Sequence, residues 1–303
     1  MTDQAKALTA SPTATRSVSW RDFLELTKPR VVALMILTAV IGMLLAAPGI
    51  PGWEVLLFGN VGIALLAGAA AVVNHVVDQK IDTVMARTRR RPVATGRVSQ
   101  VDALLFAAVL ALAGMMILMW QVNALTAWLT LASLVGYAGV YTLFLKRATP
   151  QNIVIGGLAG AMPPLLGWTA VTNQVEGHAL LLVLIIFAWT PPHFWALAIH
   201  RKEEYAKAGI PMLPVTHGNR YTELHILLYT LMLLAVTLLP FATGMSGWIY
   251  LAGAMALGLR FLQYSVRLLR GDDRRVALAT FKYSITYLMA LFVVLLVDHF
   301  FYF

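Results

Sequence analysis

Long apolar runs recur along the chain, separated by short polar segments. They lie at about 31–47, 54–77, 102–120, 123–144, 153–171, 179–199, 222–242, 247–266 and 281–297. A helix needs about 20 consecutive apolar residues to cross the hydrocarbon core of a bilayer. Each run is therefore a candidate transmembrane helix, and the pattern predicts an all-α membrane protein, a bundle of nine transmembrane helices.

The composition agrees with this pattern and excludes an ordinary soluble domain. Of the 303 residues, 59% are hydrophobic and 12% are charged, and the mean hydropathy is +0.75. Cysteine is absent, which removes disulfides and thiolate metal sites. We expect residues 1–18, which are polar and rich in Ser and Thr, to form a disordered tail rather than a cleaved signal. Residues 19–303 should then form a single domain, with two four-helix pseudo-repeats and a final helix.

The positions of the charged residues test the number of runs. All 23 Lys and Arg lie before residue 31 or in and beside every second loop, whereas the alternate loops and the C-terminus carry none. Cytoplasmic segments of membrane proteins are enriched in Lys and Arg. The sequence therefore predicts a multi-pass protein of a bacterial inner membrane, with its N-terminus in the cytoplasm and its C-terminus outside.

Polar oxygens appear where the second apolar run reaches the cytoplasmic side. Asn74, Asp78 and Asp82 recur at every fourth residue, so they share one face of a helix. Carboxylate and amide oxygens suit a hard cation such as Mg²⁺, which takes its remaining ligands from water and substrate phosphate. The alternative is a solvated helix end, although Asn74 lies one turn inside an apolar run, where an unpaired polar group is costly.

Basic residues follow these oxygens and form a second part of the pattern. The group consists of Arg87, Arg89, Arg90 and Arg91. Guanidinium groups match phosphate oxygens in pairs, and Lys146 with Arg147 forms another short basic loop. The combination indicates a diphosphate site at the membrane surface. The alternative is an anchor of positive charge on the cytoplasmic side.

A second acidic helix end follows the sixth apolar run. His200, Glu203 and Glu204 lie four runs after Asn74, Asp78 and Asp82, and the two helices point the same way. Two acidic ends that face each other would hold two Mg²⁺ ions around one diphosphate. The alternative is a surface pair of glutamates balanced by the basic residues beside it.

Two aromatic segments inside the apolar runs are further candidates. His193 follows Pro191 and Pro192, which cannot donate to the helix ladder, so we expect a kink with space beside the imidazole. His193 is then a candidate substrate contact, and the alternative is a hydrogen-bonded core residue. Tyr141, at helical spacing from Tyr137, is either packing or a wall for a cationic intermediate.

Six segments together resemble a known family. They are Leu26–Arg30, Asn74–Pro92, Tyr141–Asn152, Gly156–Trp168, Pro192–Leu197 and Tyr205–Pro214. Over roughly residues 24–300 the chain resembles the UbiA-type intramembrane prenyltransferase superfamily. The segments PHFWAL and AGIPMLP are similar to its branch that farnesylates haem.

The resemblance implies a nine-helix bundle whose central cavity is capped by cytoplasmic loops. The implied reaction moves the farnesyl group of farnesyl diphosphate to a vinyl group of haem B, with addition of water, and gives haem O for haem-copper terminal oxidases. Mg²⁺ is the implied cofactor.

The resemblance also assigns roles to the candidate residues. Asn74, Asp78 and Asp82 would take the metal and diphosphate role. The phosphate contacts would come from Arg87, Arg91 and Lys146, and a haem contact from His193. The second acidic end, Glu203 and Glu204 with Tyr141, departs from the family pattern, in which Asp is expected before the tyrosine; Glu204 would be a metal ligand there.

Other readings and partners complete the expectations. A prenyltransferase for an aromatic quinone precursor would share the Asn74, Asp78 and Asp82 pattern. A secondary transporter would place its coupling residues near mid-membrane, whereas here nearly all carboxylates gather at one interface. The expected partners are the two substrates and the bilayer, and as open alternatives a second copy of the chain, haem A synthase or oxidase assembly factors; nucleic acid is not expected.

Overall fold

The computed structural model describes residues 18–271 and 274–302, and within them every regular element is a helix. The first half contains α1 (Trp20–Leu26), α2 (Pro29–Leu45), α3 (Trp53–Val77), α4 (Gln79–Val84), α5 (Gln100–Gln121), α6 (Ala124–Leu134), the π-helix η1 (Val135–Leu145) and α7 (Lys146–Ala148). The second half contains α8 (Asn152–Ala161), α9 (Pro163–Thr172), α10 (Gly177–His200), α11 (Lys202–Lys207), α12 (Leu213–Thr216), α13 (Gly218–Val236), α14 (Leu239–Ala242), α15 (Trp248–Arg270) and α16 (Arg274–Tyr302). The predicted all-α class is confirmed, and nearly all of the predicted tail lies outside the described residues.

The membrane-spanning helices follow the apolar runs closely. Within the described residues, 8 helices are long and apolar enough to span a bilayer, or 9 if α1 and α2 count as one bent span. The pair α1 and α2 bends by 51°, and Lys28 at the bend has a left-handed backbone with φ of 51°. Ser19 and Asp22 cap the start of α1 reciprocally, as a capping box.

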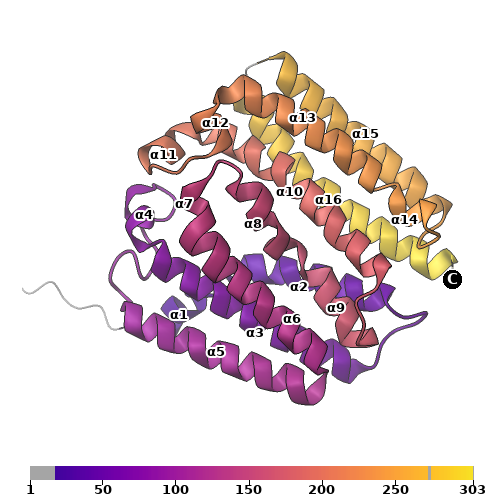
Figure 1. Ribbon diagram of the computed structural model, residues 1–303, viewed down its shortest axis with the longest axis horizontal. Coiled ribbons are helices and arrows are strands. Elements are labelled where there is room, and N and C mark those ends of the chain that lie inside the picture. Colours follow the sequence, from indigo (N-terminus) through magenta and orange to yellow (C-terminus); the bar gives the residue numbers. More distant parts are fainter. Residues whose placement is uncertain (1–17, 272–273, 303) are drawn as a thin grey trace, which may run out of the picture.

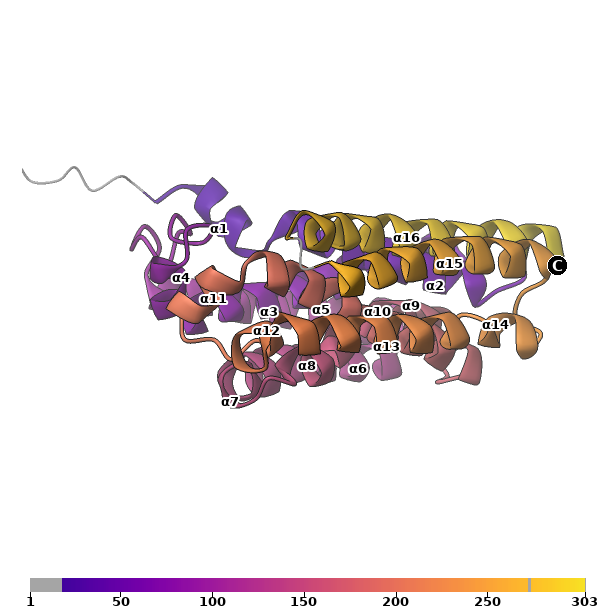
Figure 2. The ribbon, with the colours of Figure 1, turned by 90° about the horizontal axis from the view of Figure 1, so that it is seen from above.

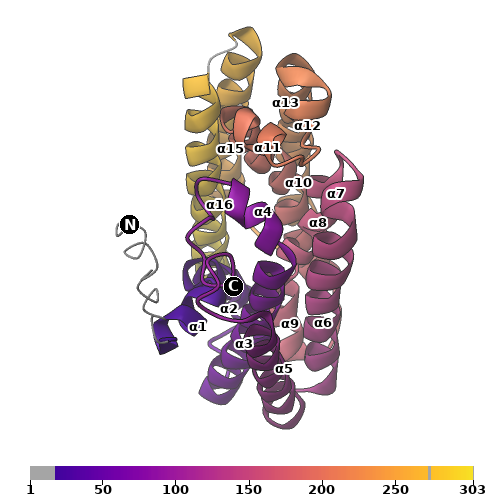
Figure 3. The ribbon, with the colours of Figure 1, turned by 90° about the vertical axis from the view of Figure 1, so that its left-hand side faces the viewer.

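One group of short helices lies at the opposite end of the bundle from the C-terminus. Figures 1 and 2 show α4, α7, α11 and α12 at one end, whereas α14 and the C-terminus lie at the other. Seen from the first end, α4 crosses the middle, between the early helices and α10 and α16 (Figure 3). Both acidic segments predicted from the sequence therefore belong to the same end of the molecule.

The two halves of the chain are joined where α2 packs against α9. A Cβ atom on Gly42 would come within 2.1 Å of the Pro164 carbonyl oxygen, and one on Gly167 within 2.0 Å of the Ala39 carbonyl oxygen. Only glycine permits so close an approach of two backbones, an arrangement common between membrane helices.

The second half surrounds α10, which packs against α8, α13 and α16. Its core contains large aromatic side chains that are fully buried, among them Trp195, Tyr250, Phe261 and Tyr287. Although Pro191 and Pro192 lie inside α10, the helix continues through both of them to His200. The segment that carries His193 is thus held by packing on three sides.

Candidate functional site

The ladder formed by Asn74, Asp78 and Asp82 keeps its helical spacing across the break between α3 and α4. Asp78 ends α3 and begins α4, but its N–H still donates to the Asn74 carbonyl at 3.0 Å, and the Asp82 N–H donates to the Asp78 carbonyl at 2.8 Å. The Asn74 amide also donates to Asp78 Oδ2 at 2.9 Å. The predicted alignment of the three side chains is therefore retained, and they are only 4%, 2% and 3% exposed.

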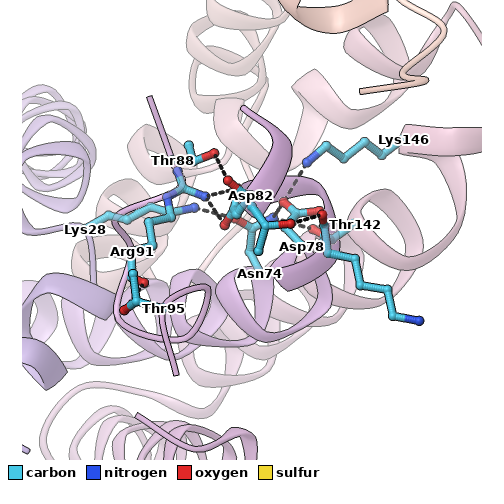
Figure 4. A network of polar contacts seen from close by, with 11 residues as sticks. Lys28, Asn74, Asp78, Asp82, Thr88, Arg91, Thr95, Thr142 and Lys146 are labelled. Atoms are coloured by element: carbon cyan, nitrogen blue, oxygen red, sulfur yellow. Dashed lines mark hydrogen bonds and ion pairs between the residues drawn. The ribbon is translucent and has the colours of Figure 1, made fainter. Parts of the chain in front are cut away.

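Three basic side chains from separate segments converge on this ladder (Figure 4). Lys28, at the bend between α1 and α2, donates from Nζ to Asn74 Oδ1 at 2.5 Å. Lys146, at the start of α7, donates to Asp78 Oδ2 at 2.6 Å. Arg91, in the loop after α4, holds both oxygens of Asp82 at 2.9 and 2.8 Å. Because buried carboxylates are tolerated only when paired, these cations make the buried ladder stable in the absence of substrate.

The oxygen set also fits a hard cation. Asp78 Oδ1 is enclosed and forms no hydrogen bond, although Oδ2 of the same carboxylate accepts from both Asn74 and Lys146. Burying an anionic oxygen without a partner costs free energy unless a bound ligand supplies the missing contact. No three acidic, His or Cys residues of the described part form a complete metal cage. A cation here would thus take its remaining ligands from amide, water and phosphate oxygens, which is how Mg²⁺ commonly binds.

The loop after α4 carries the arginines that the sequence singled out. Arg91 faces the ladder, and the Thr88 hydroxyl donates to the Asp82 carbonyl at 3.2 Å. Arg87 is exposed at the surface of the loop, and desolvation of its guanidinium, followed by the charge of Arg91, lowers its pKa. The nearby Tyr205 phenol opposes that change. The guanidinium of Arg87 therefore senses charges from both the loop after α4 and α11, and it is still charged at neutral pH.

The two carboxylates of the second acidic segment have different surroundings. Glu203 is exposed and accepts from Arg274 of α16 at 2.7 Å. Glu204 lies 3.8 Å from Arg201, and its Oε2 is enclosed without a hydrogen bond. Tyr205 packs in the same hydrophobic cluster as Met85, which follows α4, so α11 and the loop after α4 lie against each other. Both glutamates therefore have a basic neighbour, but only Glu204 has an oxygen that is enclosed without a hydrogen bond.

The π-helix η1 places aromatic and hydroxyl side chains beside the ladder. The rings of Tyr137 and Tyr141 stack at 5.6 Å, and the Tyr141 ring lies so close to Gly156 that a Cβ there would be 2.1 Å from it. The Thr142 hydroxyl receives a long hydrogen bond from Asn74, at 3.4 Å. Segments of π-helix often occur at functional sites. In this one, Tyr141 directly precedes Thr142, which contacts Asn74.

Comparison with known sequences decides the family. The sequence model of the UbiA prenyltransferase family matches residues 35–296. The chain belongs to the UbiA prenyltransferase family. It is 89% identical over 290 residues to the protein named protoheme IX farnesyltransferase from Marinobacter nauticus, covering 96% of both chains. It is 70% identical over 293 residues to the protein of the same name from Hahella chejuensis, covering 96% of this chain and 97% of that one.

Solved structures show the same fold in distant UbiA proteins. A digeranylgeranylglyceryl phosphate synthase superposes with a TM-score of 0.79 at 17% identity, over 92% of this chain and 98% of that one. A UbiA homolog from Archaeoglobus fulgidus, bound to GPP and Mg²⁺, gives a TM-score of 0.62 at 15% identity, over 90% and 99% of the two chains. The resemblance inferred from the sequence motifs is confirmed at the level of family and fold.

His193 of this UbiA chain lies apart from the ladder. Its ring stacks on Trp189 with centroids 4.1 Å apart, and Nδ1 lies 2.6 Å from the hydroxyl of Ser284 on α16. The residue is 8% exposed. The structure thus brings together the ladder, Arg91 and Lys146, whereas His193 occupies a separate position between α10 and α16.

Sequence reasoning missed several residues of the ladder site. Lys28 was visible only as part of a family segment, and nothing local predicts its contact with Asn74, 46 positions away. Thr142 and Thr88 are ordinary hydroxyls in the sequence, and their contacts depend on η1 and the loop after α4. His75, beside Asn74, has both ring nitrogens enclosed without a hydrogen bond. The signal that existed for His75 was its polarity inside an apolar run.

Proposed function

We propose that this UbiA prenyltransferase transfers the farnesyl group of farnesyl diphosphate to a vinyl group of haem B (protohaem IX), with addition of water, to give haem O and diphosphate. The observation that carries the proposal is the 89% identity to the Marinobacter nauticus protoheme IX farnesyltransferase, over 96% of both chains. The buried ladder with its three convergent cations supports it, because that arrangement suits a diphosphate leaving group.

The basic residues are the proposed diphosphate contacts. Lys146 and Arg91 each hold a carboxylate in the free protein, and Arg87 is close enough for the charges of Arg91 and Asp82 to act on its guanidinium. A diphosphate that enters this end offers these cations further anionic oxygens at short range. Positive groups fixed in a buried site stabilise the charge that develops on the departing diphosphate when the C1–O bond breaks, without the reorganisation that water would require.

The acidic residues are the proposed metal ligands. Asn74, Asp78 and Asp82, with Glu204 from the second segment, would hold Mg²⁺, which when bound supplies further positive charge to the leaving group. The unpartnered Oδ1 of Asp78 supports this assignment, and Oε2 of Glu204 is enclosed without a hydrogen bond, although it lies 3.8 Å from Arg201. Glu203 is the less suitable member of the second segment, because Arg274 already pairs with it at the surface.

The apolar interior accounts for the remaining steps. A bond forms between farnesyl C1 and the terminal vinyl carbon as the diphosphate leaves. Water then adds to the adjacent carbon and gives up a proton, so atoms and charge balance. Stacked Tyr137 and Tyr141 beside Asn74 present aromatic faces to a cationic intermediate, and His193 is the proposed haem contact. The haem propionates would favour the basic end of the bundle.

The same proposal includes orientation and context. The end that holds the ladder would face the cytoplasm of a bacterial inner membrane, and the C-terminus at the opposite end would lie outside (Figure 1). We propose nine spans, with α1 and α2 as one bent span. The product would serve haem-copper oxidases, with haem A synthase or oxidase assembly factors, or a second copy of the chain, as protein partners.

A direct test uses purified protein in nanodiscs with haem B, farnesyl diphosphate and Mg²⁺, and mass analysis of the extracted haem. The expected product is haem that has gained one farnesyl group and one water. A parallel reaction replaces haem with 4-hydroxybenzoate, an aromatic quinone precursor. Prenylation of the aromatic acid with haem left unmodified would overturn the proposal in favour of a quinone pathway.

A further inference from the structure

Two side chains of α10 contact the same residue of α16. Trp189 donates from Nε1 to the Ser284 carbonyl at 2.8 Å, and Nδ1 of His193 lies 2.6 Å from the Ser284 hydroxyl. One turn of helix separates Trp189 from His193, and their rings stack. The Phe281 ring, also on α16, lies 4.6 Å from the His193 ring by centroids. The imidazole plane is therefore fixed by contacts to both helices.

The hydrogen bonds around Ser284 decide which nitrogen of His193 carries the proton. The Ser284 hydroxyl also lies 2.7 Å from the Phe281 carbonyl oxygen and donates to it. A serine has only one hydroxyl proton. If that proton pointed at His193 instead, two oxygen lone pairs would face each other at 2.7 Å. The hydroxyl therefore accepts from His193, so Nδ1 bears the N–H of a neutral ring and Nε2 bears the lone pair.

Nε2 of His193 is open to a ligand. It forms no hydrogen bond with the part of the chain that the structure describes, and it is not among the enclosed unpartnered atoms. Both nitrogens of His75, by contrast, are enclosed. The lone pair of Nε2 thus has no partner among the described residues; the residue is 8% exposed, and its ring cannot turn without losing Ser284 and Trp189.

We propose that Ser284 is a positioning residue that fixes His193 as an axial ligand of the haem substrate's iron through Nε2. Histidine that binds iron or zinc in proteins commonly donates its other N–H to an oxygen, which sets the tautomer and the ring orientation. Here that oxygen is the Ser284 hydroxyl. The inference rests on the proposed function, because haem is the substrate assigned there.

Ser284→Ala tests the inference, with Ser265→Ala as a matched control. Ser265 is also a fully buried helix serine; its hydroxyl bonds Thr230 of a neighbouring helix at 2.9 Å and the carbonyl four residues earlier at 3.2 Å. Titration of haem B into purified protein, followed by its Soret band, gives affinity and ligation state. We expect histidine ligation in the wild type, lost in His193→Ala. In Ser284→Ala the haem affinity should fall about tenfold or more, whereas Ser265→Ala leaves it unchanged.

A further variant and a second ligand distinguish failure of this inference from failure of the proposed function. Ser284→Thr keeps the hydroxyl and should retain the wild-type spectrum and haem affinity. Affinity for farnesyl diphosphate, measured by calorimetry, should be the same in all variants. Equal haem spectra and affinities in wild type, Ser284→Ala and His193→Ala would overturn the inference. If the wild type still made haem O in that case, the proposed function would stand, whereas absence of haem O from the wild type would overturn the function itself.

Discussion

Arg91 binds both carboxylate oxygens of Asp82, at 2.9 and 2.8 Å, from a loop that follows α4. The pair is nearly buried, since Asp82 is 3% exposed. Breaking a buried pair on one side leaves the other charge uncompensated. The same guanidinium is a proposed contact for the diphosphate, so its shape matters as well as its charge.

Arg91→Lys separates shape from charge. Both bonds to Asp82 come from the single nitrogen Nη1. A lysine keeps the positive charge but lacks the further guanidinium donors that could hold a phosphate at the same time. We expect the KM for farnesyl diphosphate to rise about tenfold, and Arg91→Ala to lower kcat/KM by about two orders of magnitude. Steady-state assays with haem B in excess measure both changes. Arg89→Lys, at an exposed position of the same loop, is the comparison; an equal effect there would remove the special role of Arg91.

Asp78→Asn removes the anionic oxygen that has no partner in the free protein. The amide is nearly the same size, so the helix end should remain folded, but it binds Mg²⁺ far less well. We expect turnover to fall at least a hundredfold and the midpoint of thermal unfolding to change little. Glu54→Gln, at the exposed start of α3, should behave like the wild type. Near-normal turnover in folded Asp78→Asn would exclude Asp78 as a metal ligand.

Removal of divalent cations should stop the reaction without releasing haem. The proposed metal ligands and His193 lie in separate contacts of the structure, so chelation by EDTA should abolish turnover while the Soret titration stays unchanged. Added Mg²⁺ should restore the activity. Full turnover in the presence of excess chelator would contradict the proposed role of the ladder oxygens.

We expect Asp298 to stabilise the fold at the end of the bundle opposite to the ladder. Its carboxylate is 1% exposed and accepts from the backbone N–H of Gly247 at 2.5 Å and of Tyr250 at 2.9 Å. It therefore caps the start of α15 from α16. Asp298→Ala would strand two buried donors, and we expect a loss of about 2–3 kcal/mol in unfolding free energy. Thermal unfolding measures the loss, and turnover of the protein that remains folded should be normal.

Reporters at two positions of the chain, the C-terminus and the loop after α4, test the proposed orientation. A periplasm-active phosphatase fused after Phe303 should be active in cells, and a cytoplasm-active fluorescent protein at the same place should be dark. Insertion of the reporters after Gly96, in the loop that follows α4, should give the opposite pair of results. The same result at both sites would contradict the proposed orientation, because the number of spans between the two sites would then be even.

Much of this structure follows from local pattern in the sequence. The apolar runs predict the spans, since a backbone in lipid must satisfy its own hydrogen bonds within a helix. The spacing of Asn74, Asp78 and Asp82 predicts a shared face, and their i to i+4 backbone bonds preserve it across the end of α3. Asp298 is different, because nothing in its local sequence indicates that the structure buries its carboxylate as a cap of α15.

Only the tertiary structure decided which groups meet. Lys146 contacts Asp78 across 68 positions and His193 contacts Ser284 across 91, and no period along the chain encodes such pairs. The fold also separated Glu203, which pairs with Arg274 of a distant helix, from Glu204, which lies beside Arg201 of its own segment. Periodicity reports the backbone and the face that a side chain occupies, because both depend on near neighbours. Contacts between helices depend instead on how whole surfaces pack, as where Gly42 meets Pro164, and that packing sets the position of every distant partner.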